Sequence, residues 1–386
     1  MALTPREIMD GFALRTGLES PGGPSIRYLW TDAFAVCNFL GLYVEEKDPR
    51  DLQRALRLID ETHRVLGRHR LDDSRQGWIS GLDDAVARQH PTAGGLRIGK
   101  PLPERRPDER HDAAGEWDRD GQYFHYLTKW MQALESASRV TKEPDYHRWA
   151  VELARTAFAR FAVRDSSGSL VGLRWKLSVD LTRPLVPSMG QHDALDGFVT
   201  FSRLAGREGI AATSPEFELR REVADLAALC VGRDWTTDDS LGLGGLLCDA
   251  YALAKLMDRG VLDEPELLEG LLEASRSGLA ALVEGRGLEQ AARARLPFRE
   301  LGLTIGLRAL QRLAQRIEGM RSGLEDRGSV RRSIGALARH SWIVTSIESF
   351  WQQRENRASP TWTGHREINE VMLATSLAPD GYLETG

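Results

Sequence analysis

Apolar residues recur at three- and four-residue spacing along most of the chain, which is typical of helices that pack on at least one face. Capping signals bound several of these segments, and Thr4, Pro5 and Glu7 form a capping box ahead of the first. The pattern predicts helices at about 5–15, 28–43, 49–69, 118–139, 144–161, 192–204, 215–231, 241–257, 265–283, 297–317, 330–354 and 365–377. The segment 170–179 is the one candidate for a strand.

The predicted helices alternate in character. The odd-numbered helices one to nine each begin with a proline, are amphipathic and follow short polar connections, whereas the even-numbered ones are apolar on more than one side and richer in glycine. The connections into the even helices are longer, and six of the ten tryptophans lie in them or just inside the following helix. A closed ring of six helical hairpins requires this alternation, while an open solenoid usually has a regular repeat length. We therefore expect a single all-α domain spanning 1–386, an (α/α)6 barrel with parallel even-numbered helices inside and long loops at one rim.

Three of the segments that lead into even helices are rich in aromatic, acidic and histidine residues. They read EWDRDGQYFHYLTKW, WKLSVDLTRPLVPSMGQHDALDG and TWTGHREINEVM. In its helix order and in the placement of these segments, the chain resembles the (α/α)6-toroid proteins, namely the six-hairpin glycosidases and the N-acylglucosamine and cellobiose epimerases. The resemblance implies an active site at the N-terminal ends of the inner helices and a carbohydrate or a similarly polar substrate.

Paired carboxylates at this rim suggest glycoside hydrolysis as the first hypothesis. Hydrolysis needs one carboxylic acid to protonate the leaving oxygen and a second carboxylate to act as base or nucleophile. We expect Asp118 or Asp120 to pair with Asp193, all at predicted helix starts, where the helix dipole also favours anions and hydroxyl groups. The alternative is that these acids only cap their helices. Glu367 is a further candidate for a catalytic carboxylate.

Histidine-based epimerisation is the alternative hypothesis. This reaction needs two acid/base groups that exchange protons near neutral pH, and His192 and His365 both stand at predicted inner-helix starts. The resemblance implies a catalytic histidine near the last inner helix, which His365 matches. The family's second histidine lies on the eighth helix, where this chain has none.

Aromatic and basic residues of the same segments are candidates for substrate binding. An aromatic ring can stack on a sugar, or it can simply pack a loop onto the rim. Arg97 and its neighbours Lys100, Arg105 and Arg106 suit an anionic group, although such a run is often a solvated loop. The glycine run from Gly242 lacks the lysine of a phosphate loop and predicts close helix packing. The expected binding residues are Trp30, Asp32, Arg97, Trp117, Tyr123, His125, Trp175, Trp362 and Arg366.

Composition limits the classes of partner. The 51 basic and 56 acidic side chains are interleaved and give a net charge of −5, so a nucleic-acid partner is not expected. The N-terminus is charged and there is no run of 18 apolar residues, so we expect a soluble protein without membrane contact. The three cysteines lie in apolar stretches, which favours a cytoplasmic location. We expect the protein to be a monomer or a homodimer. No motif calls for a metal or a cofactor. An isoprenoid cyclase and a non-catalytic binding protein remain further alternatives.

Overall fold

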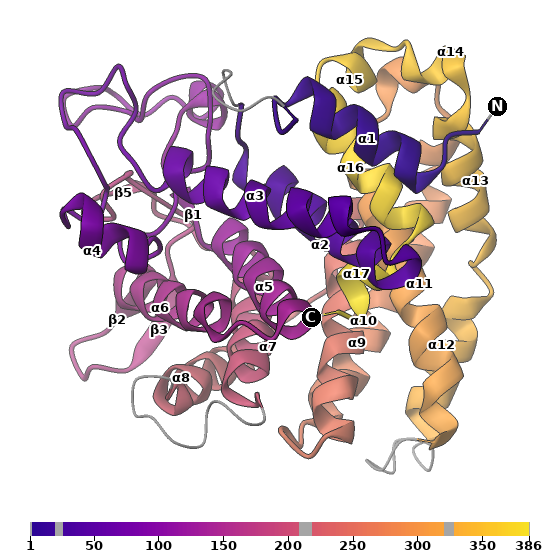
Figure 1. The fold of residues 1–386 in the computed structure, drawn as a ribbon. Helices are drawn as coiled ribbons and strands as arrows, with labels where there is room; N and C mark the ends of the chain where they lie inside the picture. Colours follow the sequence, from indigo (N-terminus) through magenta and orange to yellow (C-terminus); the bar gives the residue numbers. More distant parts are fainter. Residues whose placement is uncertain (1, 20–25, 208–217, 320–327, 386) are drawn as a thin grey trace. The chain divides into compact units, whose positions relative to one another are not determined.

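A computed structural model describes residues 2–19, 26–207, 218–319 and 328–385, and Figure 1 traces their helices and strands. Contacts among these residues divide the chain into two compact units. We call 13–231 with 385–386 the N-terminal unit, and 232–384 with 1–12 the C-terminal unit. The organisation as a single domain therefore stays a prediction.

The N-terminal unit is built from helical hairpins. Their helices are α2 (Leu29–Glu46), α3 (Pro49–Leu66), α5 (Phe124–Thr141), α6 (Pro144–Phe161), α7 (Asp193–Ala205) and α8 (Arg220–Cys230). Within this unit α2 packs against α3 and α5, α5 against α6 and α7, and α7 against α8. Helices α2, α5 and α7, which correspond to the predicted inner helices two, four and six, are buried on nearly every side. The buried residues of α5 and α7 include polar ones, among them Lys129 and Asp196. Their partners α3 and α6 keep a polar face exposed.

Short strands tie the loops of this unit to the starts of α5 and α7. Strands β1 (Gln122–Tyr123), β4 (Lys176–Leu177) and β5 (Pro184–Val186) form one antiparallel sheet in the order β1-β4-β5, and β2 (Ala162–Arg164) pairs with β3 (Leu170–Leu173). The predicted strand at 170–179 is thus two short strands. Long segments around them contain α4 (Asp84–Gln89) and the 3-10 turn η1 (Gly115–Asp118).

The C-terminal unit is also helical. It contains α9 (Ser240–Asp258), α10 (Pro265–Glu284), α11 (Pro297–Arg316), α12 (Gly328–Ala338), α13 (Trp342–Gln352) and α16 (Arg366–Leu377), and α1 (Pro5–Arg15) opens the chain. Helix α11 packs against α9, α16 and α13, while α10 packs against α9 and α12. Shorter pieces are η3 (Gly287–Glu289), η4 (Ala292–Ala294), η5 (Ile317–Gly319), α14 (Arg354–Arg357), α15 (Pro360–Thr363) and α17 (Asp380–Leu383).

Glycines allow α9 and α11 to approach closely. A Cβ atom on Gly244 would lie 2.1 Å from the carbonyl oxygen of Gly302, and one on Gly306 would lie 2.5 Å from that of Gly244. Real Cβ atoms do not come this near to a backbone atom, so neither position tolerates a side chain without a shift of the helices. The prediction that the glycine run from Gly242 serves helix packing is confirmed at Gly244.

Two predicted helices differ from the observed ones. The prediction that a helix begins at Asp118 is wrong, because α5 begins at Phe124. Gly121 has φ +148° and the next two residues pair with β4, so the chain reaches the helix in an extended conformation. The prediction of one helix over 330–354 is also wrong, because α12 and α13 are separated at 339–341. The other predicted helices agree with the structure to within a few residues, except that 215–217 lie outside the described residues.

Helix α9 is long and apolar enough to cross a membrane by length and composition. Of its most apolar window, 67% is buried inside the protein, as in the core helix of a globular unit.

Candidate functional site

The first turns of α5 and α7 bring a polar cluster together in the N-terminal unit. His125 and Lys129 are four residues apart on α5, and Asp193 and Asp196 are three residues apart on α7, so each pair shares one face of its helix. Lys129 Nζ lies 2.7 Å from Asp196 Oδ1, and the hydroxyl of Thr128 donates to Asp196 Oδ2 at 2.5 Å. His125 Nδ1 lies 3.7 Å from Asp193 Oδ1. The cluster thus contains one carboxylate paired with Lys129, that of Asp196, and a second carboxyl group, that of Asp193, beside the His125 imidazole.

Asp193 has the properties of an acid that exchanges protons near neutral pH. It is 5% exposed, and within the cluster it faces the negative charge of Asp196. Burial and that charge raise the pKa of Asp193 to about 7, against the lowering effects of the Gly190 N–H, which donates to it at 3.1 Å, and of Lys129. A carboxyl group with such a pKa serves equally well as proton donor and acceptor at pH 7.

His125 supplies a neutral imidazole to the same cluster. Burial lowers its pKa to about 4, with opposing effects of Asp196 and Lys129, so the ring is uncharged at neutral pH. Its Nδ1 atom is buried and forms no hydrogen bond with any residue that the structure describes. The 3.7 Å separation from Asp193 is too long for a hydrogen bond. Buried polar atoms are normally satisfied, so this nitrogen is available to a water or a ligand.

Aromatic rings surround the imidazole. Tyr123 and Trp175 stack on it with ring centroids 5.3 and 6.2 Å away, and Trp30 and Tyr126 meet it edge-on at 6.1 and 4.9 Å. Trp30 Nε1 is a second buried polar atom without a hydrogen bond to a described residue. Rings with an apolar face and a polar edge suit a sugar, whose C–H faces stack while its hydroxyl groups accept and donate.

The aromatic wall continues on both sides of these four rings. The hydroxyl groups of Tyr28 and Tyr126 lie 2.8 Å apart, and Lys100 Nζ lies 5.4 Å from the centre of the Tyr28 ring. Trp117 meets Trp175 edge-on at 5.0 Å and is 51% exposed. All four of the aromatic rings predicted as binding residues in this unit, Trp30, Trp117, Tyr123 and Trp175, therefore lie in one cluster with His125.

Asp120 and Arg97 are joined in a buried hydrogen-bond network. Asp120 is fully buried, and one oxygen accepts from Arg97 Nη1 at 2.8 Å while the other accepts from the N–H groups of Gly99, Lys100 and Gly121. Arg97 also donates to the carbonyl oxygens of 65 and 68. These contacts engage both oxygens of Asp120, and the catalytic role of Asp120 and the binding role of Arg97 stay predictions.

Asp118 and Asp32 also differ from their predicted settings. Asp118 ends the turn η1 and is exposed, away from any α-helix N-terminus. Asp32 is buried within α2, accepts from Tyr28 N–H at 3.1 Å and forms an ion pair with Arg27 at 3.4 Å. Burial raises the pKa of Asp32 to about 6 despite the charge of Arg27. The binding role of Asp32 stays a prediction.

The remaining predicted residues stand at helix starts. His192 precedes α7 and is half-buried. In the C-terminal unit His365 precedes α16, is exposed and meets the Phe298 ring edge-on at 6.2 Å. Arg366 pairs with Glu370 at 2.9 Å, Glu367 is half-buried, and Trp362 is 2% exposed and stacked on Trp351, which leaves its ring no free face. The catalytic and binding roles of these five residues stay predictions.

Sequence inspection missed three residues of the cluster: Thr128, Lys129 and Asp196. Helical spacing was the signal that could have found them, because Lys129 follows His125 by four residues and Asp196 follows Asp193 by three. No group of three or more His, Cys, Asp or Glu side chains in the described part of the chain is arranged to hold a metal ion.

Comparisons with known proteins find relatives only among solved structures. No family model matches the sequence, and no curated protein does. The structure is similar to that of cellobiose 2-epimerase from Spirochaeta thermophila, with a TM-score of 0.50 and 13% identity over 96% of this chain and 97% of that one. A sugar epimerase from a ruminal bacterium has a TM-score of 0.46 and 10% identity, covering 87% and 86% of the two chains.

The first of these similarities confirms the predicted fold class. It extends over nearly the full length of both chains, so the protein has the all-α fold of an (α/α)6 toroid. At 13% identity the similarity is one of fold, and activity has to be argued from the site.

Proposed function

We propose that this protein is a carbohydrate-active enzyme, a sugar epimerase or isomerase, and that the cluster of His125 and Asp193 is its acid/base centre. One observation carries the proposal: a carboxyl group with a pKa of about 7 lies 3.7 Å from a neutral imidazole whose Nδ1 has no hydrogen bond to a described residue. The aromatic wall around the imidazole supports a sugar as the substrate.

Epimerisation beside a sugar carbonyl needs a base and an acid at the same time. The neutral His125 would remove the proton from the carbon next to the carbonyl, and protonated Asp193 would give its proton to the carbonyl oxygen, forming an enediol. Both groups are in the required protonation state between about pH 4 and pH 7. A proton returned to the opposite face of the carbon, while the Asp193 carboxylate takes the O–H proton back from the enediol, would complete the inversion. His192, in the same unit, is the predicted donor, and exchange with solvent would restore the starting protonation of the two histidines.

The fold similarity to a cellobiose 2-epimerase supports a reducing saccharide as the substrate class. Because one fold hosts many activities, this support is weaker than that from the site itself. Cytoplasmic location, and a monomeric or homodimeric state, stay predictions from the sequence.

Solvent deuterium exchange tests the proposal. The protein is incubated in D2O with a panel of reducing mono- and disaccharides, and products are followed by NMR. We expect deuterium at the carbon next to the carbonyl, an epimer or a ketose as product, and no increase in the number of reducing ends. His125→Gln should lose at least 100-fold in rate, whereas His111→Gln, at an exposed position outside the cluster, should keep it.

Glycoside hydrolysis is the second candidate, favoured by the raised pKa of Asp193, since a general acid must be protonated at neutral pH. It needs a second carboxylate, and the predicted partner Asp120 is held by Arg97 and three backbone N–H groups. New reducing ends without deuterium exchange would select this candidate. Binding of a saccharide without turnover would instead indicate the non-catalytic alternative, and no interaction with any saccharide would leave the cyclase hypothesis.

A further inference from the structure

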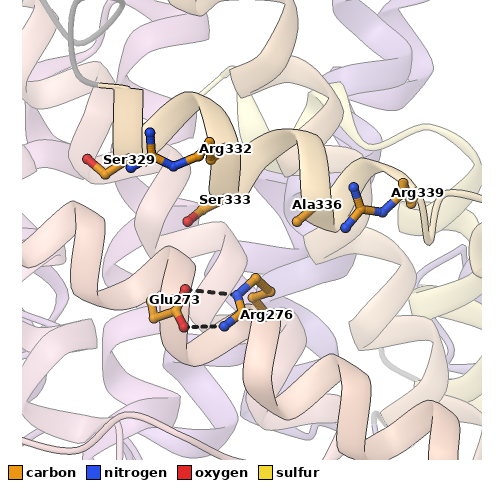
Figure 2. A pocket seen from close by; sticks show the side chains of 7 residues that line it. All are labelled: Glu273, Arg276, Ser329, Arg332, Ser333, Ala336 and Arg339. Atoms are coloured by element: carbon orange, nitrogen blue, oxygen red, sulfur yellow. Dashed lines mark hydrogen bonds and ion pairs between the residues drawn. The ribbon is translucent and has the colours of Figure 1, made fainter.

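A basic groove lies between α10 and α12 of the C-terminal unit, apart from every residue discussed above. It encloses about 450 Å³ and is lined by Glu273, Arg276, Ser329, Arg332, Ser333, Ala336 and Arg339 (Figure 2). Three of its seven residues are arginines, and none is a large apolar residue. Ligand pockets of similar volume are usually lined mainly by apolar side chains. This groove therefore suits a strongly polar ligand.

Helix α12 and the turn that follows it supply five of the seven residues that line the groove. Ser329 is followed by Arg332 and Ser333 three and four residues later, then by Ala336 and Arg339 at further steps of three, so these residues lie on the same side of the helix or its C-terminal extension. Arg332 and Arg339 are two helical turns, or roughly 10 Å, apart along the axis. Both side chains are exposed, and within the described part of the chain neither guanidinium has a hydrogen bond or an ion pair.

Helix α10 supplies the opposite side. Arg276 forms a bidentate ion pair with Glu273, with N–O distances of 2.9 and 2.5 Å, which Figure 2 marks with dashed lines. Hydrogen bonding to Arg276 holds the pKa of Glu273 below its usual value, so this carboxylate is ionised at neutral pH. Three guanidinium groups and one carboxylate leave the groove with two positive charges in excess.

We propose that this groove binds a small soluble anion that carries at least two phosphate groups. The planar guanidinium fork matches the oxygens of a phosphate, and two exposed arginines whose backbones lie roughly 10 Å apart along the helix axis can each donate to one of two linked phosphates. Ser333, between Arg332 and Arg339 along the chain, and Ser329, one turn before Arg332, add hydroxyl donors. The net charge of −5 on the chain disfavours a long polyanion such as a nucleic acid, which would extend beyond the groove.

Calorimetric titration of the full chain with inorganic pyrophosphate tests this inference. Arg332→Gln and Arg339→Gln should each weaken binding at least 10-fold. Arg331→Gln is the matched control, because Arg331 is an exposed arginine of the same helix that does not line the groove, and its affinity should stay within 2-fold of the parent. Orthophosphate, with a single phosphate group, should bind at least 10-fold more weakly than pyrophosphate.

Glu273→Gln should change the affinity for pyrophosphate in the opposite direction. This change removes a carboxylate that repels the ligand and also releases Arg276, so pyrophosphate should bind more tightly, by 3-fold or more. All four positions are exposed, and unchanged thermal unfolding would verify that the variants are folded. Absence of pyrophosphate binding, equal weakening in Arg331→Gln, or weaker binding by Glu273→Gln would each overturn the proposal. None of these results depends on the reaction proposed for His125 and Asp193.

Discussion

Asp193 owes its raised pKa first to burial and then to Asp196, its neighbour on the same helix. Asp196 repels a negative charge on Asp193, whereas Lys129 favours one, and the balance together with burial raises the pKa of Asp193 to about 7. If protonated Asp193 is the acid, kcat/KM should fall above about pH 7, and the need for neutral His125 should give a second fall below about pH 4.

Asp196→Asn should move the alkaline limb of that profile to lower pH. The substitution removes the negative charge beside Asp193 and frees the Lys129 charge, and both effects lower the pKa of Asp193. We expect a displacement of about one pH unit. The measurement is kcat/KM against pH on the saccharide that gives turnover. A loss of rate without any displacement of the limb would mean that Asp196 only supports the structure.

Asp193→Asn should inactivate the enzyme and stabilise it at alkaline pH. A carboxyl group whose pKa is higher in the folded than in the unfolded chain stabilises the protein below about pH 4, and this contribution is lost as pH rises through about 7. Asparagine never ionises and avoids that loss, so the free energy of unfolding at pH 8 should rise by roughly 1 to 3 kcal/mol.

Urea denaturation of Asp193→Asn at pH 4 and pH 8 checks this expectation. The gain in stability over the parent should be present at pH 8 and small at pH 4. Asp118→Asn, at an exposed site, is the control and should show no gain at either pH. A variant that is less stable than the parent at pH 8 would contradict the assigned pKa.

At the scale of elements, the close contact between α9 and α11 depends on the glycine residues where the two helices meet. Gly244→Ala would place a methyl group 2.1 Å from the Gly302 carbonyl oxygen and should cost about 2 to 4 kcal/mol, since the helices must separate. Gly245→Ala is the adjacent control, because a Cβ there meets nothing within 4 Å, and it should raise stability by about 0.5 to 1 kcal/mol through helix propensity. Equal effects of the two changes in denaturant titration would refute the close contact.

Asp120 fixes the loop 97–100 to the entrance of β1. Asp120→Ala leaves Arg97 buried without its carboxylate and three N–H groups without an acceptor, so it should cost about 3 to 5 kcal/mol. Asp118→Ala, two residues earlier and exposed, should be nearly neutral. If Asp120→Ala instead keeps the thermal midpoint of the parent and loses only turnover, Asp120 is catalytic after all.

Local pattern predicted most helices but only part of the site. Proline positions and apolar periodicity placed α1 and α6 at their observed limits, because these signals act within a few residues. The helix start near Asp118 was wrong because the pairing of Gln122 with Leu177 joins segments 55 residues apart, and no local pattern encodes that pairing. The buried ion pair of Asp120 with Arg97 could not be predicted either, because the sequence alone does not distinguish an aspartate that caps a helix from one that is catalytic or one that binds a loop.

At the scale of the whole molecule, the alternation of amphipathic and buried helices was the most informative feature of the sequence. It predicted the (α/α)6 fold class that the similarity to a cellobiose 2-epimerase confirms at 13% identity. An alternation of buried and amphipathic helices can be shared by chains of low sequence identity, because burial requires only apolar character and a suitable volume at each position. Substrate choice depends instead on a few polar side chains, and the fold leaves these free to vary.

The most direct test of the central claim is a crystal structure of the protein soaked with cellobiose. The account predicts a sugar ring against the aromatic wall of Trp30, Tyr126 and Trp175, with hydroxyl or carbonyl oxygens within hydrogen-bond distance of His125 Nδ1 and the Asp193 carboxyl group. A sugar bound only elsewhere, with His125 Nδ1 hydrogen-bonded to a protein group instead, would contradict the assignment of this cluster as the acid/base centre.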